Sequence, residues 1–154
     1  SMKTKVILAL VITAALTACS NTVFMECKEL PTEGWHKDSL CVFEVPITET
    51  DATYQMQLII RNDGGYPNQN LWLFVDQIKP DKSCTRDTVQ FFLADNFGRW
   101  TGSGVGSIFE NVWIYRDHVK YKEAGTYKIR VAQGMRYDML EGICDVGVKV
   151  IKTN

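Results

Sequence analysis

The sequence predicts an all-β fold, an antiparallel β-sandwich of jelly-roll or immunoglobulin-like type, in a single domain that follows a signal peptide. In several segments apolar and polar residues alternate with a period of two, and residues 54–61 are the clearest case. This period is typical of a strand with one buried face. Turn-forming residues, as at 62–65, separate these segments. No segment beyond the signal peptide keeps a period of 3.6 residues, so we expect no long helix.

The N-terminal segment has the three parts of a secretory signal peptide: a basic start at Lys3 and Lys5, an apolar run, and small residues before a cleavage site. The apolar run, residues 6–18, is about 13 residues long, whereas a membrane-spanning helix needs roughly 20. Residues 16–19, Leu-Thr-Ala-Cys, resemble the lipobox of bacterial lipoproteins, in which the cysteine thiol takes a diacylglycerol and becomes the acylated N-terminus. We therefore predict lipid attachment at Cys19. The alternative is an ordinary signal peptide with a chance cysteine.

These features divide the chain into three parts. Residues 1–18 form the signal peptide, in which Ser1 precedes the expected start methionine and is taken as a remnant of expression. Residues 19–34 form the lipidated N-terminus and a tether, because residues 20–28 are mixed in composition and show no periodicity. Residues 35–154 form the β-sandwich domain, which is long enough to bury a sizeable core.

About seven or eight short strands are expected in this domain. In chain order they are 41–45, 54–61, 71–78, 88–94, one or two within 111–121, 127–133 and a last one around 146–150. The glycine-rich residues 100–106 predict a loop, and residues 135–141 a short helical turn. Tyr127 enters its strand two residues after a glycine, which resembles the tyrosine corner of many sandwiches, where the hydroxyl bonds to the backbone.

The predicted strand at 71–78 is more uniformly apolar than the others. Both of its faces are therefore expected to be covered. Within it, Trp72 alternates with Leu71 and Leu73, which places the indole on the face opposite the main core.

The charge balance bears on possible partners. The chain carries 17 basic and 18 acidic side chains, a formal net charge of −1, and no basic stripe. Nucleic acid is therefore not an expected partner. No second apolar run approaches the length of a membrane span. Contact with the membrane is expected through the N-terminal lipid, and more than one acyl chain is needed to hold a protein there firmly.

Four cysteines remain beside the one in the lipobox: Cys27, Cys41, Cys84 and Cys144. An even number in an exported chain is compatible with disulfides, in any of three pairings, and equally with free buried thiols. No two are spaced as Cys-x-x-Cys, which disfavours a thioredoxin-like or zinc site. We expect no cofactor and no metal. A site built from Cys27, His36 and Cys41 is the less favoured alternative.

No motif indicates catalysis. The run of glycines at 102–106 lacks the Gly-x-Gly-x-x-Gly spacing and opens no helix, so nucleotide binding is not expected. His36 and His118 have no nucleophile signature beside them. The carboxylates show no pair that stands out as acid and base. We therefore expect that the protein is not an enzyme.

Aromatic residues are the more informative group for binding. A flat platform that stacks on sugar rings or on a partner protein is one interpretation of the larger set, Trp35, Trp72, Trp100 and Trp113 with Tyr66 and Tyr115. The other interpretation is that these side chains cap the two ends of the sandwich. The candidate binding surface consists of Tyr66, Trp72 and Trp100.

A series of short phrases spans nearly the whole chain after Cys19. In order they are 34–38, 61–62, 66–67, 70–73, 87–89, 93–95, 98–100, 102 with 104, 133–136, 142–143 and 145–147. Together they resemble the gliding-motility-associated lipoprotein H (GldH) family of Bacteroidetes-type bacteria, and Cys19 matches the lipidated position of that family.

The resemblance implies a lipoprotein held in the outer membrane by acyl chains such as palmitate on Cys19 and facing the periplasm. An acidic run directly after the lipidated cysteine resembles a surface-export signal in these bacteria. Residues 20–23 contain no such run, and this favours the periplasmic leaflet. Members of the family are associated with the gliding machinery and the linked secretion apparatus, so envelope proteins are the expected partners. No catalytic residue is carried over from the family.

We therefore expect a non-enzymatic docking or assembly component of the cell envelope. The alternative is a carbohydrate-binding module that stacks glycans on Trp72 or Trp100.

Overall fold

A computed structural model describes residues 21–154, and these residues form eleven β-strands and no helix. In chain order the strands are β1 (Thr22–Glu29), β2 (Trp35–His36), β3 (Cys41–Ile47), β4 (Tyr54–Asp63), β5 (Asn70–Ile78), β6 (Cys84–Phe92), β7 (Ser103–Val105), β8 (Ile108–Val119), β9 (Gly125–Gln133), β10 (Met139–Leu140) and β11 (Ile143–Lys152). No helix long and apolar enough to cross a membrane occurs among residues 21–154. The predicted signal peptide and Cys19 lie outside the described residues.

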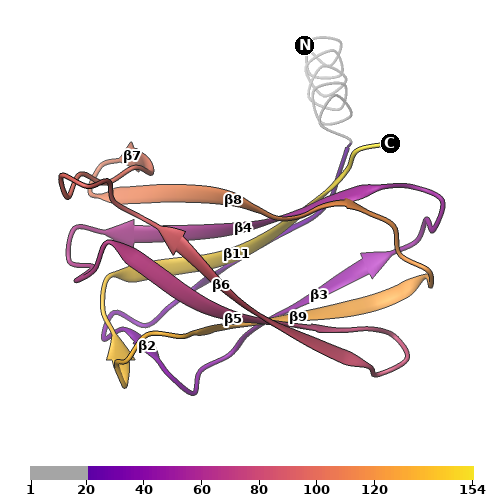
Figure 1. Cartoon of the computed structure of the whole chain (residues 1–154), viewed down its shortest axis with the longest axis horizontal. Coiled ribbons are helices and arrows are strands. Elements are labelled where there is room, and N and C mark those ends of the chain that lie inside the picture. The colour runs from indigo at the N-terminus through magenta and orange to yellow at the C-terminus, as the bar shows by residue number, and fades with distance from the viewer. Residues whose placement is uncertain (1–20) are drawn as a thin grey trace, which may run out of the picture.

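The strands form two antiparallel sheets that pack face to face, as the two layers in Figure 1 show. The five-stranded sheet has the order β1-β11-β4-β8-β7 and the four-stranded sheet the order β3-β9-β5-β6, while β10 and β2 pair separately. Eight of the described strands have seven or more residues, and in chain order they are β1, β3, β4, β5, β6, β8, β9 and β11. Counted one to eight in this order, they lie in the five-stranded sheet as 1-8-3-6 and in the four-stranded sheet as 2-7-4-5. This is the strand order of a jelly roll. The predicted β-sandwich is confirmed, and of its two alternatives the jelly roll is the correct one.

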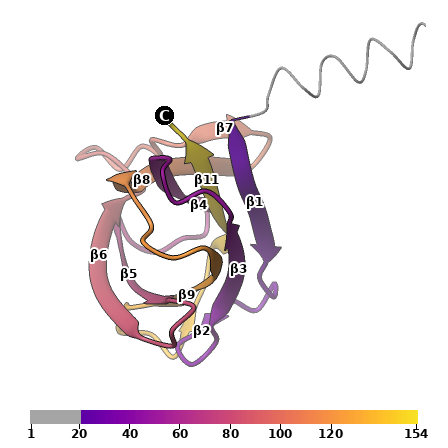
Figure 2. The ribbon, with the colours of Figure 1, turned by 90° about the vertical axis from the view of Figure 1, so that its right-hand side faces the viewer.

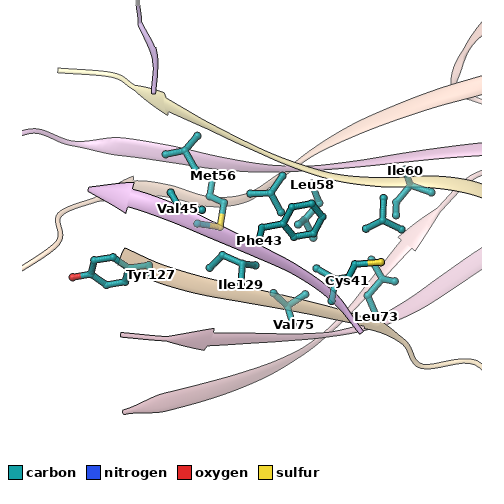
Figure 3. Packing of buried hydrophobic residues seen from close by; sticks show 14 of the residues in the cluster. Cys41, Phe43, Val45, Met56, Leu58, Ile60, Leu73, Val75, Tyr127 and Ile129 are labelled. Atoms are coloured by element: carbon teal, nitrogen blue, oxygen red, sulfur yellow. The ribbon is translucent and has the colours of Figure 1, made fainter. Parts of the chain in front are cut away.

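Alternation along the strands places one face of each sheet in a shared core. Met56 and Leu58 of β4 and Phe43 and Val45 of β3 are at most 1% exposed. Figure 3 shows these side chains converging between the two sheets. A fully buried side chain of this size contributes about 1.5–3 kcal/mol relative to leaving it in water. The alternation predicted for these two strands is confirmed.

The tether predicted over residues 19–34 is wrong for the residues of β1. This strand pairs with β11 along its length, at the edge of the five-stranded sheet beside β3 (Figure 2). The alternation of apolar and polar residues is weak in β1, because an edge strand has few buried positions. Phe24 packs against the core, whereas Met25 is 54% exposed. Its partner lies at the other end of the chain, so the pairing leaves no local signal. Within residues 21–154 the first strand of the sandwich therefore begins at Thr22.

Three smaller predictions concern the loops and β8. Residues 135–141 form no helical turn, because β10 pairs with β2 and buries Leu140 opposite Trp35. The loop predicted at 100–106 contains the short strand β7, which pairs with β8. Where one or two strands were expected, β8 is continuous, with register shifts opposite the start of β4.

The two-sided cover predicted for β5 is also wrong. Leu71, Leu73 and Val75 are fully buried between the sheets, but Trp72 is 38% exposed on the outer face. The placement of Trp72 opposite the core is therefore confirmed. Uniform apolarity misled the prediction because an outward residue can be apolar without being covered.

Tyr127 forms the predicted tyrosine corner. Its ring is buried, and its hydroxyl donates to the backbone carbonyl of Glu123 at 2.6 Å. Tyr54 makes the same kind of bond to the carbonyl of Glu49, at 2.8 Å. Both bonds anchor loops at the same end of the sandwich.

The cysteines of the described chain are free thiols, namely Cys27, Cys41, Cys84 and Cys144. Cys41 lies in the core, and burial raises the pKa of its thiol to about 11. Residues 21–154 contain no group of three or more His, Cys, Asp or Glu side chains placed to hold a metal ion, so Cys27, His36 and Cys41 do not form a site.

Candidate functional site: a groove beside Trp72

The sandwich has two ends with different contents. We call one of them the terminal end, because β1 begins there and β11 ends there. At this end the backbone N–H of Lys152 donates to the carbonyl of Asn21 at 2.8 Å. At the opposite end, which we call the loop end, lie the connections 64–69, 93–102 and 134–138 (Figure 1). The candidate site lies toward the loop end.

A groove of about 670 Å³ lies there, on the outer face of the four-stranded sheet. Its lining residues are Asn68, Trp72, Thr88, Gly134, Met135, Arg136 and Tyr137. Trp72 projects from β5 and Thr88 from the neighbouring β6, while the opposite wall is the loop that follows β9. An exposed indole beside thioether, amide and guanidinium groups offers both apolar and polar contacts to a ligand.

The loop wall is held from beneath by a buried glutamine. Gln133 is 2% exposed, and its side-chain amide donates to the carbonyl of Tyr137 at 2.8 Å. The side-chain oxygen of Gln133 accepts from the backbone N–H of Met135, also at 2.8 Å. The backbone N–H of Gly134 donates to the carbonyl of Trp72 at 2.7 Å. These bonds fix the loop against β5, so the groove has a defined shape.

Gly134 allows the loop to lie this close to β5. A Cβ at this position would lie 3.2 Å from the ring of Phe74 and 3.3 Å from Cβ of Trp72. Contacts this short require the neighbours to move. Glycine is thus the residue that fits where the wall meets the floor of the groove.

A charged cluster lies beside the groove on the same sheet face. Asp76 of β5 is 3% exposed and accepts hydrogen bonds from Arg86, at 2.7 and 3.1 Å, and from Arg130, at 3.1 Å. The hydrogen bonds from Arg86, more than the charge of Arg130, hold the pKa of Asp76 below its ordinary value. The guanidinium of Arg86 also lies 5.5 Å from the centre of the Phe74 ring. Together with Arg136, this cluster has a positive balance that favours acidic or polar groups on a ligand.

The structure does not bring the three predicted surface residues together. Tyr66 is 4% exposed and its hydroxyl donates to the carbonyl of Asn70. Trp100 is partly buried, with its ring centre 6.4 Å from that of Tyr66 and 6.0 Å from that of Phe109. These two residues pack the loop end of the sandwich. Only Trp72 lines the groove.

The remaining aromatic residues of the predicted platform also pack inside the fold. Trp35 is fully buried and donates from Nε1 to the carbonyl of Ser39 at 2.9 Å. Trp113 stacks on Phe91 with ring centres 4.2 Å apart, which closes the side of the sandwich between β8 and β6. The hydroxyl of Tyr115 donates to Asp87 nearby. These residues therefore form no exposed platform, and Trp113 and Tyr115 close a side of the sandwich where a cap on one of its ends was the alternative.

Sequence reasoning missed the groove residues other than Trp72. Met135, Arg136 and Tyr137 lie where a helical turn was expected, and Asn68 lies in an irregular segment that carried no binding signal. The phrase 133–136 was noted only as part of a resemblance. In the structure these residues belong to the groove wall, which the hydrogen bonds of Gln133 hold in place.

A family model described as GldH lipoprotein matches residues 22–150, which is most of the sandwich. The chain belongs to the GldH lipoprotein family. It is 34% identical over 127 residues to the gliding motility lipoprotein GldH homolog of Christiangramia forsetii, with 78% of each chain covered. It is 33% identical over 135 residues to the gliding motility lipoprotein GldH of Flavobacterium johnsoniae, with 83% of each chain covered. The resemblance inferred from the sequence phrases is confirmed.

Solved structures show a weaker likeness to this GldH-family chain. An arabinose-bound α-L-arabinofuranosidase gives a TM-score of 0.40 at 9% identity, covering 79% of this chain and 18% of that one. A subviral particle of infectious bursal disease virus VP2 gives a TM-score of 0.37 at 8% identity, covering 85% of this chain and 31% of that one. These values are too low to carry an argument about either protein.

Most of the phrases that carry the GldH resemblance lie toward the loop end. Residues 34–38 include β2, residues 66–67 and 98–100 lie in the loops, and residues 133–136 form the groove wall. Trp72 lies in the phrase at 70–73, where β5 begins. Several of these phrases therefore lie in or beside the candidate site.

Proposed function

We propose that this chain is a lipid-anchored, non-enzymatic docking component of the cell envelope that acts with the gliding machinery. In this proposal residues 1–18 are a signal peptide, and Cys19 carries the lipid in the outer membrane, on the leaflet that faces the periplasm. Membership of a lipoprotein family and the lipobox at residues 16–19 support the anchor. The absence of an acidic run at residues 20–23 favours the periplasmic leaflet.

The groove beside Trp72 is the observation that carries the docking role. The nine residues of β5 run from the groove toward the terminal end, and a strand rises about 3.3 Å per residue, so the groove stands roughly 20–30 Å from that end. An anchor at Cys19 adjoins the terminal end, because β1 begins there. The groove is thereby held away from the lipid anchor, where another envelope protein has access to it.

The chemistry of the groove suits binding better than turnover. Among its lining residues, all within the described chain, there is no carboxylate, imidazole or thiol to serve as base or nucleophile. Tryptophan and arginine are the residue types that contribute most to protein–protein contacts, and the groove contains Trp72 and Arg136. A partner segment that combines an apolar side chain with an acidic or amide group fits this lining.

A site-specific crosslink tests the docking proposal. A photoreactive amino acid replaces Thr88, which lines the groove, and the same amino acid replaces Thr126, an exposed residue near the terminal end of β9, as the matched control. After irradiation of intact cells we expect the Thr88 probe to capture a defined envelope protein, and Trp72→Ala to abolish the capture. Identical products from both positions, or glycan with no protein partner at Thr88, would contradict the proposal.

Glycan binding is the second candidate, and the exposure of Trp72 is what favours it. An indole with one open face beside amide and hydroxyl groups can stack on a sugar ring. Titration of the tryptophan fluorescence with envelope polysaccharides should then shift and saturate, and Trp72→Ala should remove the change. A flat response across a broad panel removes this candidate.

A further inference from the structure

The outer face of the five-stranded sheet carries exposed aliphatic side chains. We call the set Met25, Cys27, Ile59, Val112 and Ile114 the aliphatic strip. Met25, Val112 and Ile114 are 54, 48 and 56% exposed. Apolar side chains gathered on an exposed sheet face mark a surface that contacts something else.

The strip is continuous because of a glycine. Cys27, Gly147, Ile59 and Val112 lie side by side on four neighbouring strands. A Cβ on Gly147 would be 2.5 Å from Sγ of Cys27 and 3.2 Å from Cβ of Ile59, so the thiol fills the space that a side chain would take. Ile59 is only 1% exposed although it points outward, because its neighbours enclose it. The result is a shallow aliphatic surface across four strands.

Polarity changes along this face. In the next row toward the loop end, Arg61 pairs with Glu110 at 2.8 Å and with Asp145 at 3.9 Å. In the row on the terminal side, Lys149 and Gln57 stand between Met25 and Ile114. The aliphatic strip is therefore bordered by paired charges toward the loop end, and on the terminal side its members Met25 and Ile114 are separated by polar side chains.

The strand that carries Met25 and Cys27 of the strip is also the described strand nearest to Cys19 in the sequence. Cys19 is three residues before Thr22, the first residue of β1. Consecutive Cα atoms are 3.8 Å apart, so whatever the conformation of the intervening residues, the two Cα atoms are separated by at most about 11 Å. A lipid on Cys19 therefore holds the edge of the five-stranded sheet at the bilayer surface.

We propose that the aliphatic strip rests on the lipid surface, with Met25, Val112 and Ile114 directed into the interfacial region. This inference rests on the proposed lipid at Cys19. The lining also favours lipid over a protein partner, because the strip is aliphatic and shallow and has none of the Trp, Tyr or Arg anchors typical of protein contacts. The alkyl stem of Lys149 can lie along the strip while its ammonium group reaches the headgroups. The outer face of the four-stranded sheet, with the Trp72 groove, then faces away from the membrane.

Methionine oxidation tests the orientation without changing the sequence. Met25 lies on the strip and is 54% exposed, while Met139 lies in β10 near the loop end and is 42% exposed, so the two are matched probes in one chain. The lipidated protein, purified from envelopes and placed in vesicles of phosphatidylethanolamine and phosphatidylglycerol, is treated with hydrogen peroxide, and sulfoxide formation is followed by mass spectrometry. Relative to the unlipidated chain in solution, we expect oxidation of Met25 to slow several-fold and that of Met139 to be unchanged.

A second probe separates contact of the whole face from shielding by the nearby lipid. Ile114→Met places a methionine on β8, three strands away from β1, and Thr88→Met places one on the opposite face of the sandwich. We expect protection at position 114 and none at position 88. Protection of Met25 alone, or equal rates at all positions, would overturn the proposal.

The mass of the N-terminal peptide in the same samples separates this inference from the proposed function. An unmodified N-terminus would overturn both. An acylated N-terminus with an unprotected strip would overturn the orientation and leave the anchor intact. Protection that appears only at high protein density on the vesicle would assign the strip to a second copy of this chain. Protection found only in native envelopes would assign it to another protein, and either result overturns contact with lipid.

Discussion

The outer faces of the two sheets differ although both follow the same alternation. The four-stranded sheet presents a groove, an exposed indole and a carboxylate between two guanidinium groups. The five-stranded sheet presents a shallow aliphatic strip bordered by paired charges. In a jelly roll the inward residues fix the fold, and the outward residues are left to select partners. The difference teaches that the two faces serve two surroundings, which we propose to be an envelope protein and a bilayer.

The largest expected effect comes from removing the anchor that would set both faces in place. Cys19→Ala should abolish labelling by a radioactive fatty acid, because the thiol that would take the lipid is removed. It should also move the protein from the membrane fraction to the soluble fraction, because no helix among residues 21–154 is long and apolar enough to cross a membrane. Cys27→Ala is the control, and it should be labelled like the natural chain. Full labelling of Cys19→Ala would contradict the lipid assignment.

The next effect concerns the charged cluster of the four-stranded sheet. Asp76→Asn leaves Arg86 and Arg130 without their carboxylate, and we expect it to lower the free energy of unfolding by about 1–3 kcal/mol in urea at neutral pH. Glu44→Gln is the control, because Glu44 is 3.9 Å from Lys128 at an exposed site. There the expected loss is below about 0.5 kcal/mol.

The same variant carries a pH signature. The pKa of Asp76 is lowered in the folded state, so its stabilising contribution is complete above the unfolded value of about 3.9 and is lost as the pH falls through the lower folded value. The stability difference between the natural chain and Asp76→Asn should therefore shrink as the pH falls below about 4. A difference that stayed constant down to the acid transition would show that the loss does not depend on the ionised form of the Asp76 carboxyl.

A smaller effect is expected on the opposite face. Gly147→Ala places a Cβ against Sγ of Cys27, and we expect a loss of about 1–2 kcal/mol. Cys27→Ala combined with Gly147→Ala should recover part of this loss, since the thiol is the atom in the way. Gly64→Ala is the control, because no atom lies within 4 Å of the added carbon. Equal losses in the single and double variants would show that the backbone, and not the thiol, sets the limit.

The smallest effect on stability separates folding from membrane contact. Ile114→Gln changes a side chain that is 56% exposed, so the free energy of unfolding should change by less than about 0.5 kcal/mol. On vesicles, however, the protection of Met25 from oxidation should weaken. A large drop in the urea midpoint would show instead that Ile114 supports the fold.

The sequence was most informative where a signal is local. Residues 54–61 alternate over a full strand and end at a turn, and β4 forms there with the predicted face buried. The corner at Tyr127 needs only a glycine and a nearby carbonyl, and it is present. The strands β1, β2, β7 and β10 were missed because their partners are distant in the chain or their length is only two or three residues.

The candidate site was harder to predict because it depends on which aromatic residues remain exposed. Alternation placed Trp72 outward correctly, since its neighbours on β5 are in the core. Tyr66 and Trp100 lie in irregular segments, where no period indicates which way a side chain points, and both pack inward. The groove wall at 134–137 depends on hydrogen bonds to the side chain of Gln133, and no local sequence pattern predicts that this amide is buried.

The buried amide of Gln133 has a consequence for the speed and cost of recognition. A wall held by hydrogen bonds inside the fold keeps its shape when no partner is present, so little conformational entropy is lost when one arrives. Association then needs no rearrangement of this chain, and its rate is set by collision and orientation. In the proposed docking role, affinity is then tuned by how slowly a partner dissociates from Trp72 and Met135.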